Sequence, residues 1–184
     1  MKILGISGSL RDESFNTKLL RAAVELAPDE VELELWDGLK AVPPFDEDDE
    51  VGPAPAGVAR LRDAIVGADA VLFATPEYNS SIPGQLKNAI DWASRPVATA
   101  VLRNKPVAVV GASTGMFGAV WAQAELRKVL ASAGARVLES DLPVPVAHTG
   151  FDEAGRLTDE ETRERLSAVV QSLRDTVAGV LVSA

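Results

Sequence analysis

Short, unbroken apolar runs recur along the chain, and each one ends in a polar or glycine-containing stretch. Residues 2–7, 68–75 and 106–112 are such runs, and each has the length of a strand that is buried on both faces. Between residues 31 and 35 apolar side chains alternate with acidic ones, which predicts a half-exposed strand near a sheet edge. A last short strand is expected over 135–138, so the pattern predicts five strands.

Helical periodicity fills the segments between these runs, with apolar residues recurring every three or four positions. Five helices are expected, with bounds near 15–27, 58–66, 85–93, 119–133 and 158–182. In the fourth, the expected inward positions are Val120, Ala124, Val129 and Leu130. The last helix should begin at Thr158 and Asp159, where a capping residue is followed by acids in the first turn.

Five strands alternating with five helices, without an internal repeat, predict an α/β fold with a doubly wound parallel sheet. In such sheets ligands bind beyond the carboxyl ends of the strands, where the strand order reverses. Three polar loops, 8–16, 76–82 and 113–118, each follow the carboxyl end of a buried strand. One site built from three loops is therefore predicted at one edge of the sheet.

The first loop has the composition of a phosphate site. It leads into a helix, where the first backbone N–H groups lack intrahelical partners and the macrodipole favours an anion. Further donors in and beside the loop are Ser9, Arg11, Ser14, Asn16 and Thr17. Alternatively, Ser9, Ser14 and Asn16 only cap the helix and form turns. The loop has neither the P-loop nor the G-x-G-x-x-G pattern, so a mononucleotide phosphate is the better prediction.

The other two loops suit a flat, polar ring. Tyr78 lies between Pro76 and Pro83, in a stiff loop with free backbone N–H groups that can bond ring heteroatoms. The loop at 113–118 is small and contains glycine, so a flat ligand can approach its backbone closely. A phosphate at one end and a flat polar ring at the other describe FMN. A flavin brings its own redox chemistry, so no catalytic side chain is required.

Composition narrows the remaining functional classes. The net charge is −9 and there is no basic run, which argues against binding nucleic acid. There is no cysteine, which excludes disulfides and thiolate chemistry, and the one histidine makes a poor metal site. No signal peptide or membrane-spanning run is found, so a cytoplasmic protein is expected, with a single domain over 1–184. The acidic run at 46–50 lacks EF-hand spacing and is interpreted as a solvated loop.

Two blocks carry a family resemblance. The first is Gly8-Ser9-Leu10-Arg11 with Ser14-Phe15-Asn16; the second is Pro76-Glu77-Tyr78-Asn79 with Pro83-Gly84 and the stretch 86–92. Both resemble the NADPH-dependent FMN reductase family, and in particular its bacterial chromate and quinone reductase branch. The resemblance implies a flavodoxin-like fold with strand order 2-1-3-4-5, bound FMN and NADPH or NADH as reductant. It also implies a small-molecule electron acceptor, such as a quinone or a flavin, and a homodimer or homotetramer.

Matching positions assign the cofactor contacts that the resemblance implies. The phosphate would be held by Ser9, Leu10, Arg11, Ser14, Phe15 and Asn16. The isoalloxazine and ribityl groups would be faced by Pro76, Glu77, Tyr78 and Asn79, and Ser113 would line the third loop. The sequence departs from the family pattern at 117–119, where relatives often have paired glycines, so the choice between NADPH and NADH stays open.

Two other functions remain as alternatives. Gly111 to Gly115 matches the G-x-S-x-G nucleophile elbow, and Asp141 and His148 follow in hydrolase order, so a serine hydrolase using Ser113 is conceivable. That interpretation lacks an upstream oxyanion glycine cluster and leaves the first two loops without a role. The other alternative is a flavodoxin-like electron carrier or an FMN-binding sensor without turnover of its own.

Several single residues near these motifs receive structural interpretations. Glu77 is interpreted as an anchor of the flavin loop, with a solvated turn acid as the alternative. Lys87 and Asp91 are interpreted as an ion pair on the surface of one helix. The tryptophans are expected to pack in the core or at a subunit interface rather than to contact flavin; they are Trp36, Trp92 and Trp121.

Overall fold

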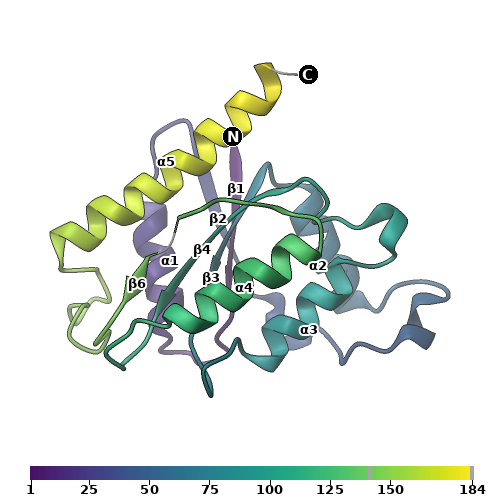
Figure 1. Cartoon of the computed structure of the whole chain (residues 1–184), viewed down its shortest axis with the longest axis horizontal. Coiled ribbons are helices and arrows are strands. Elements are labelled where there is room, and N and C mark those ends of the chain that lie inside the picture. The colour runs from purple at the N-terminus through teal and green to yellow at the C-terminus, as the bar shows by residue number, and fades with distance from the viewer. Residues whose placement is uncertain (141, 183–184) are drawn as a thin grey trace.

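The computed structural model describes residues 1–140 and 142–182, and a parallel sheet runs through its centre (Figure 1). Its strands are β1 (Lys2–Ser7), β2 (Glu32–Trp36), β3 (Ala70–Ala74), β4 (Pro106–Ala112), β5 (Arg136–Val137) and β6 (Pro143–Val144). The strand order is β2-β1-β3-β4-β5, and every pairing is parallel. The predicted order 2-1-3-4-5 and the α/β class are therefore confirmed.

Helices cover both faces of this sheet. They are α1 (Phe15–Glu25), α2 (Ala56–Val66), α3 (Gly84–Ala93), α4 (Val120–Ser132) and α5 (Glu160–Val182). α1 and α5 pack on one face, and α2, α3 and α4 pack on the other. Strand residues alternate between the two apolar clusters: Val71 and Phe73 join α2, α3 and α4, whereas Ala70 and Leu72 join α1 and α5.

The edge strand beyond β4 differs from the sequence-based prediction. A strand over 135–138 and a loop over 141–156 were expected, but β5 is shorter and β6 lies inside the expected loop. The prediction of five strands is therefore wrong at this edge. β6 pairs with Gly111 and Ala112, and the buried side chain of Gln123 accepts a hydrogen bond from the Leu142 N–H at 3.2 Å. A two-residue strand is too short to show a periodicity of apolar residues, and β6 is held instead by contacts with residues distant in the sequence.

The long connection between β2 and α2 is fixed by polar side chains of α3. It contains two 3-10 helices, η1 (Gly38–Ala41) and η2 (Glu47–Glu50). Gln85 Nε2 donates to two carbonyl oxygens of this connection, at 2.8 and 2.9 Å, and Asn88 and Trp92 both donate to the Pro43 oxygen.

Within residues 1–140 and 142–182, no cluster of acidic or histidine side chains could hold a metal ion.

Two of the interpreted side chains in α3 lie where they were expected. Trp92 is fully buried and packs edge-on against Phe45, with ring centroids 4.9 Å apart. Lys87 and Asp91 form an ion pair of 2.7 Å along the helix surface. η3 (Val97–Thr99) follows α3 and interrupts the connection that leads to β4.

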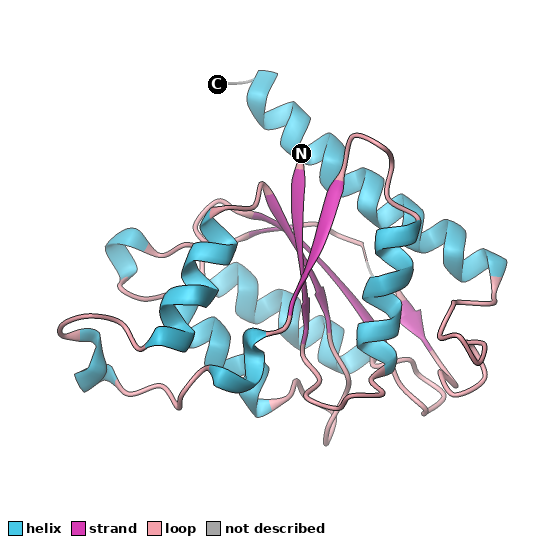
Figure 2. Cartoon of the chain, turned by 180° about the vertical axis from the view of Figure 1, so that it is seen from behind, coloured by secondary structure: helices cyan, strands magenta, loops and turns pink. Residues whose placement is uncertain are grey.

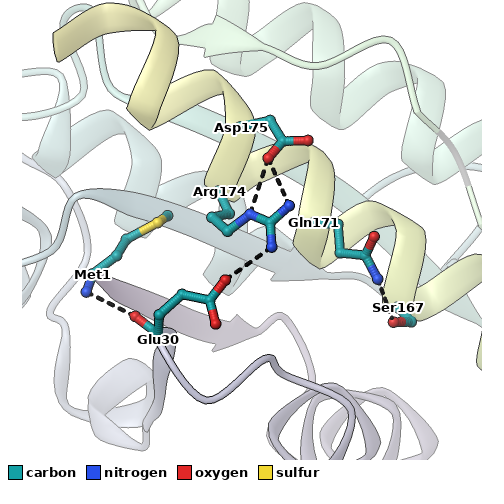
Figure 3. Close-up of polar contacts among 6 residues, drawn as sticks. All are labelled: Met1, Glu30, Ser167, Gln171, Arg174 and Asp175. Carbon is teal, nitrogen blue, oxygen red and sulfur yellow. Dashed lines mark hydrogen bonds and ion pairs between the residues drawn. The ribbon is translucent and has the colours of Figure 1, made fainter. Parts of the chain in front are cut away.

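The last helix is tied to the start of the chain. Arg174 Nη1 lies 2.9 Å from Glu30 Oε1, and the amino group of Met1 donates to the Glu30 carbonyl at 3.0 Å (Figure 3). Asp175 supports the guanidinium from the other side, and these carboxylates raise the pKa of Arg174. The helix begins as predicted, because Asp159 accepts a hydrogen bond from the Thr162 N–H.

α4 shows a second departure from the predicted pattern. Its buried side chains are Ala122, Gln123, Leu126 and Leu130. Of the four expected inward residues only Leu130 is fully buried, and Ala124 is exposed. Apolar periodicity does not mark Gln123, which is buried in this helix. Across the described ranges, no helix has both the length and the apolar character needed to cross a membrane.

Candidate functional site

The three predicted loops come together at one edge of the sheet. Because β1, β3 and β4 are parallel neighbours, their carboxyl ends share an edge, which is the lower one in Figure 2. Backbone hydrogen bonds continue past the strands: Gly8 N–H donates to Ala74 at 2.8 Å, and Thr75 N–H donates to Val110 at 3.0 Å. The predicted convergence of the loops is therefore present in the structure.

Hydrogen bonds within the first loop and to the start of α1 organise this loop. Ser7 Oγ accepts from the Thr17 hydroxyl at 3.0 Å and from the Ser9 N–H at 3.3 Å. Ser9 Oγ in turn accepts from the Arg11 N–H at 3.3 Å. Ser14 caps α1, accepting from the Thr17 N–H, so its side chain has the capping role that was the alternative prediction. The loop thus has a defined shape before any ligand binds.

The amino end of α1 is open to an anion. In the described part of the chain the Phe15 and Asn16 N–H groups make no hydrogen bond, and the first turn holds no acidic residue. Arg11 is exposed in the same loop, four residues before Phe15. Glu13 pairs instead with Lys18 at 2.8 Å, and the hydrogen bond from Lys18 lowers the pKa of Glu13. Free N–H groups, a helix dipole and a nearby guanidinium are the features of a phosphate site.

Two of the predicted phosphate contacts have side chains engaged elsewhere. Asn16 is buried, and its amide exchanges two hydrogen bonds of 2.9 Å with the backbone of Ala112 at the end of β4. The Phe15 ring stacks on Phe151, with centroids 5.9 Å apart. Both residues can therefore offer only their backbone N–H groups to a phosphate, while the Asn16 side chain holds α1 against the third loop.

The second loop is a tight hairpin. Tyr78 and Ser81 exchange hydrogen bonds of 3.0 and 3.1 Å, and Asn79 and Ser80 between them have φ values of 52° and 61°. This is the backbone of a type I′ turn, so the loop is stiffened by its own hydrogen bonds as well as by its prolines. Tyr78 is 48% exposed, and the Asn79 and Ser80 N–H groups have no acceptor within the described residues. The hairpin therefore presents donors and an aromatic side chain.

The third loop exposes a cluster of apolar side chains. Met116 and Phe117 are exposed, and the Phe117 ring meets Trp121 edge-on with centroids 4.9 Å apart. Trp121 is itself 49% exposed, so it is not a core residue, whereas Trp36 is partly buried. Ser113 Oγ accepts from the Gly115 N–H at 3.1 Å, which shapes the loop. A flat ligand at this edge would meet an apolar wall.

Glu77 joins the second loop to the third. Its Oε2 accepts hydrogen bonds from the N–H groups of Trp121 and Ala122, each at 3.1 Å. Ala119, at the start of α4, supplies no capping side chain, so Glu77 caps this helix from a distant loop. Glu77 is therefore an anchor of its loop rather than a solvated acid, and its partner is the amino end of α4.

Comparison with known proteins assigns this arrangement to a family. Residues 1–149 match the NADPH-dependent FMN reductase family. The chain belongs to this family. It is 43% identical over 175 residues to an NAD(P)H-dependent FMN reductase of Pseudomonas aeruginosa, covering 95% of this chain and 94% of the relative. It is 39% identical over 181 residues to an NADPH:quinone oxidoreductase of Arabidopsis thaliana, covering 95% and 90%.

A solved structure agrees with these sequence relatives. The flavoenzyme NAD(P)H:(acceptor) oxidoreductase FerB of Paracoccus denitrificans superposes with a TM-score of 0.87 at 37% identity, and 97% of each chain is covered. The predicted resemblance and the flavodoxin-like fold are therefore confirmed.

The serine hydrolase alternative gains no support from the family or from the geometry. In the described ranges no hydrogen bond joins Ser113 to His148, which is exposed. Asp141, the third member of that alternative, lies outside the described residues.

Proposed function

We propose that this protein is an NAD(P)H-dependent, FMN-containing oxidoreductase that passes electrons to quinones, flavins or similar acceptors. The observation that carries the proposal is the open amino end of α1 beside Arg11, at the same edge as two ring-facing loops. The residues present fit FMN, because the first loop offers donors suited to a phosphate and the second loop offers donors suited to a polar ring. Bound FMN would supply the redox chemistry, accepting a hydride and passing electrons on.

The residues of the first loop would bind the phosphate. Ser9, Leu10 and Arg11 would surround it, and the Phe15 and Asn16 N–H groups would point at it. Ser14 would act by capping α1, and the Asn16 side chain would act by holding α1 to β4.

The residues of the other two loops would hold the ring. Pro76 and Tyr78 would border it, the Asn79 and Ser80 N–H groups would donate to it, and Ser113 would line its third side. Glu77 would keep the two loops in register by capping α4. No side chain of the protein transfers a proton in this scheme, so the protein binds, orients and partly covers the reacting partners.

The apolar side chains of the third loop favour assembly as well as acceptor binding. Met116, Phe117 and Trp121 are exposed together beside the site, and exposed apolar clusters mark interaction surfaces. We therefore propose that the protein is a homodimer or homotetramer. We further propose that it acts in the cytoplasm and that the whole chain is one FMN-binding domain. Light scattering of the purified protein would give the oligomeric state directly.

A visible absorption spectrum tests the central proposal. The purified protein, supplied with FMN, should show a flavin spectrum that bleaches when NADPH is added without oxygen. A flavin spectrum that persists would favour the electron carrier or sensor. Absence of bound flavin would reject the proposal and direct attention to an esterase assay that compares the wild type with the Ser113→Ala variant.

A substitution in the first loop tests the phosphate assignment separately. Arg11→Ala should weaken FMN binding by about 10- to 150-fold, the loss of a charge-assisted contact of about 1.5–3 kcal/mol. Arg60→Ala, which removes an exposed arginine of α2, is the matched control and should leave FMN affinity unchanged. Equal affinity of both variants and the wild type would reject the role of Arg11.

Ser113→Ala should keep most of its reductase turnover, whereas a hydrolase would lose nearly all its activity.

A further inference from the structure

A pocket lies on the other side of the first loop from the two ring-facing loops. It has a volume of about 340 Å³ and opens between α1 and the carboxyl ends of β1 and β2, with η1 beside it. Since β1 separates β2 from β3 in the sheet, the pocket lies on the β2 side of β1, whereas the hairpin follows β3 on the other side. Ser9, Leu10 and Arg11 line this pocket and belong to the proposed phosphate loop, whereas the lining residues of α1, β2 and η1 have no role in the proposed FMN site.

The base of the pocket is apolar. Leu20 and Leu39 are buried there, and Leu35 is 37% exposed at the end of the edge strand. Trp36 forms one wall, and its ring packs directly over Gly38, where a Cβ atom would lie 2.5 Å from Trp36 Cζ2. The missing side chain of Gly38 thus lets the indole lie against the backbone. The volume of the pocket is near the lower limit for small-molecule sites, and one of its walls is aromatic. Both features suit a purine-sized group.

The rim of the pocket is cationic, although the chain as a whole has a net charge of −9. Arg11, Arg21 and Lys40 line it, come from three different elements and are all exposed. Within residues 1–140 and 142–182 no ion pair involves any of the three. The carboxylates in the lining are Asp12 and Asp37, and with Arg11 assigned to the FMN phosphate, Arg21 and Lys40 remain as the cations that a second ligand would meet. Unpaired cations around an apolar base are suited to a phosphorylated aromatic ligand.

We propose that this pocket binds the adenosine end of NADPH, with Arg21 and Lys40 holding its 2′-phosphate and Trp36 beside the purine. The inference rests on the proposed function and adds to it the position and identity of the reductant. Arg11 lines this pocket as well as belonging to the first loop, and it remains assigned to the FMN phosphate. β2 and β4 are separated by three strand spacings, about 14 Å in all, and a dinucleotide joined through its pyrophosphate bridges such a span.

This placement predicts a preference for NADPH over NADH. The two dinucleotides differ only in the 2′-phosphate, so removing its partners should affect one and spare the other. In the FMN-loaded protein, the double variant Arg21→Ala, Lys40→Ala should lower the ratio of kcat/KM for NADPH to kcat/KM for NADH at least tenfold. The change should lie in KM rather than in kcat. Arg60→Ala, which removes an exposed cation outside the pocket, should leave that ratio unchanged.

Binding of a fragment tests the pocket without turnover. Adenosine 2′,5′-bisphosphate, titrated by calorimetry, should bind the FMN-loaded wild type and compete with NADPH, and its affinity should fall at least tenfold in the double variant. Adenosine 5′-monophosphate should bind more weakly than the bisphosphate. Equal binding of the two nucleotides, or an unchanged dinucleotide ratio in the double variant, would overturn the assignment.

Failure of the proposed function would give a different pattern. If FMN binds but neither dinucleotide reduces it, the reductase proposal fails, while the bisphosphate titration still decides whether the pocket takes a 2′-phosphorylated adenosine. If both dinucleotides reduce the flavin but the bisphosphate does not bind, the reductase stands and the pocket assignment is rejected.

Discussion

Glu77 Oε2 lies 3.1 Å from the backbone nitrogen of Trp121, a residue 44 positions further along the chain. Through this contact, a residue in the loop that follows β3 caps the helix that follows β4. The hairpin at Tyr78 and the apolar pair at Phe117 are therefore positioned relative to each other by one carboxylate. Binding of a ring between these loops would therefore depend on Glu77, even without a contact between Glu77 and the ring.

Removing that carboxylate should loosen both loops. We expect Glu77→Ala to lower the free energy of unfolding by about 0.5–2 kcal/mol, the usual cost of losing a helix cap. It should also weaken FMN binding, because the loops would no longer be held in register. Glu77→Gln keeps an acceptor oxygen and should retain most of both properties. Urea unfolding and FMN titration would measure the two effects, with Glu164→Ala on α5 as an exposed control. A Glu77→Ala protein as stable as the wild type would contradict the capping role.

Two asparagines offer a matched test of the tie between α1 and β4. Asn16 and Asn88 each exchange a pair of hydrogen bonds with backbone, Asn16 with Ala112 beside the site and Asn88 with Pro43 and Phe45 away from it. Asn16 is fully buried, so Asn16→Ala leaves two unsatisfied groups and should cost about 2–4 kcal/mol of stability.

The two substitutions should separate in FMN binding. Asn16→Ala should weaken FMN binding as well as stability, since α1 would shift relative to the third loop. Asn88→Ala should lower stability by about 1–2 kcal/mol and leave FMN affinity intact. Differential scanning fluorimetry and FMN titration distinguish the outcomes. Equal FMN affinity in both variants would show that the Asn16 tie is not needed for the site.

The parts of the fold that follow local periodicity could be predicted from the sequence. The apolar residues of the runs at 2–7, 68–75 and 106–112 are buried on both faces of the sheet, so each run has the pattern of a buried strand. Parallel pairing then places their loops at one edge. The capping role of Asp159 is equally local, because its partner Thr162 is three residues away. Such features need only a few neighbouring residues to be specified.

The missed features depend on contacts between distant segments. β6 is held by pairing with β4 and by Gln123, a polar residue that no apolar periodicity marks as buried. The hairpin at Tyr78 has Asn-Ser at its centre rather than the Asn-Gly pair that signals a type I′ turn. The partner of Glu77 could not be found either, because only the folded chain brings α4 to the second loop.

Asp159 gives a prediction for the dependence of stability on pH. Hydrogen bonds from the hydroxyl and the N–H of Thr162 lower the pKa of this carboxyl in the folded state. The unfolded chain therefore binds the proton more readily, so the contribution of Asp159 is complete above its ordinary pKa of about 3.9 and is lost as the pH falls through the lowered value.

A neutral cap removes that titration. Asp159→Asn should be slightly less stable than the wild type at pH 7, because the charge that favours the helix dipole is gone. The difference should shrink as the pH falls from 5 to 2, since only the wild type loses its charged cap. Urea unfolding at several pH values would measure it. A difference that stays constant with pH would mean that the carboxylate charge contributes nothing to the cap.

Two glycines near helix starts should respond in opposite directions to alanine. Gly57 in α2 is buried, and a Cβ atom there would lie 2.1 Å from the carbonyl oxygen of Ala41, the last residue of η1. Gly84, the first residue of α3, has no atom within 4 Å of a new Cβ. Alanine favours helix at both positions by up to about 1 kcal/mol.

At Gly57 the clash with backbone should outweigh the gain in helix propensity. η1 is held by Gln85 through the carbonyls of Leu39 and Val42, so it cannot move away without breaking those bonds. We expect Gly57→Ala to lose about 1–3 kcal/mol of stability and Gly84→Ala to gain up to about 1 kcal/mol. Thermal unfolding of the two variants would show opposite shifts of Tm. Because Leu39 and Lys40 line the pocket beside β2, Gly57→Ala should also weaken binding of adenosine 2′,5′-bisphosphate, whereas Gly84→Ala should not.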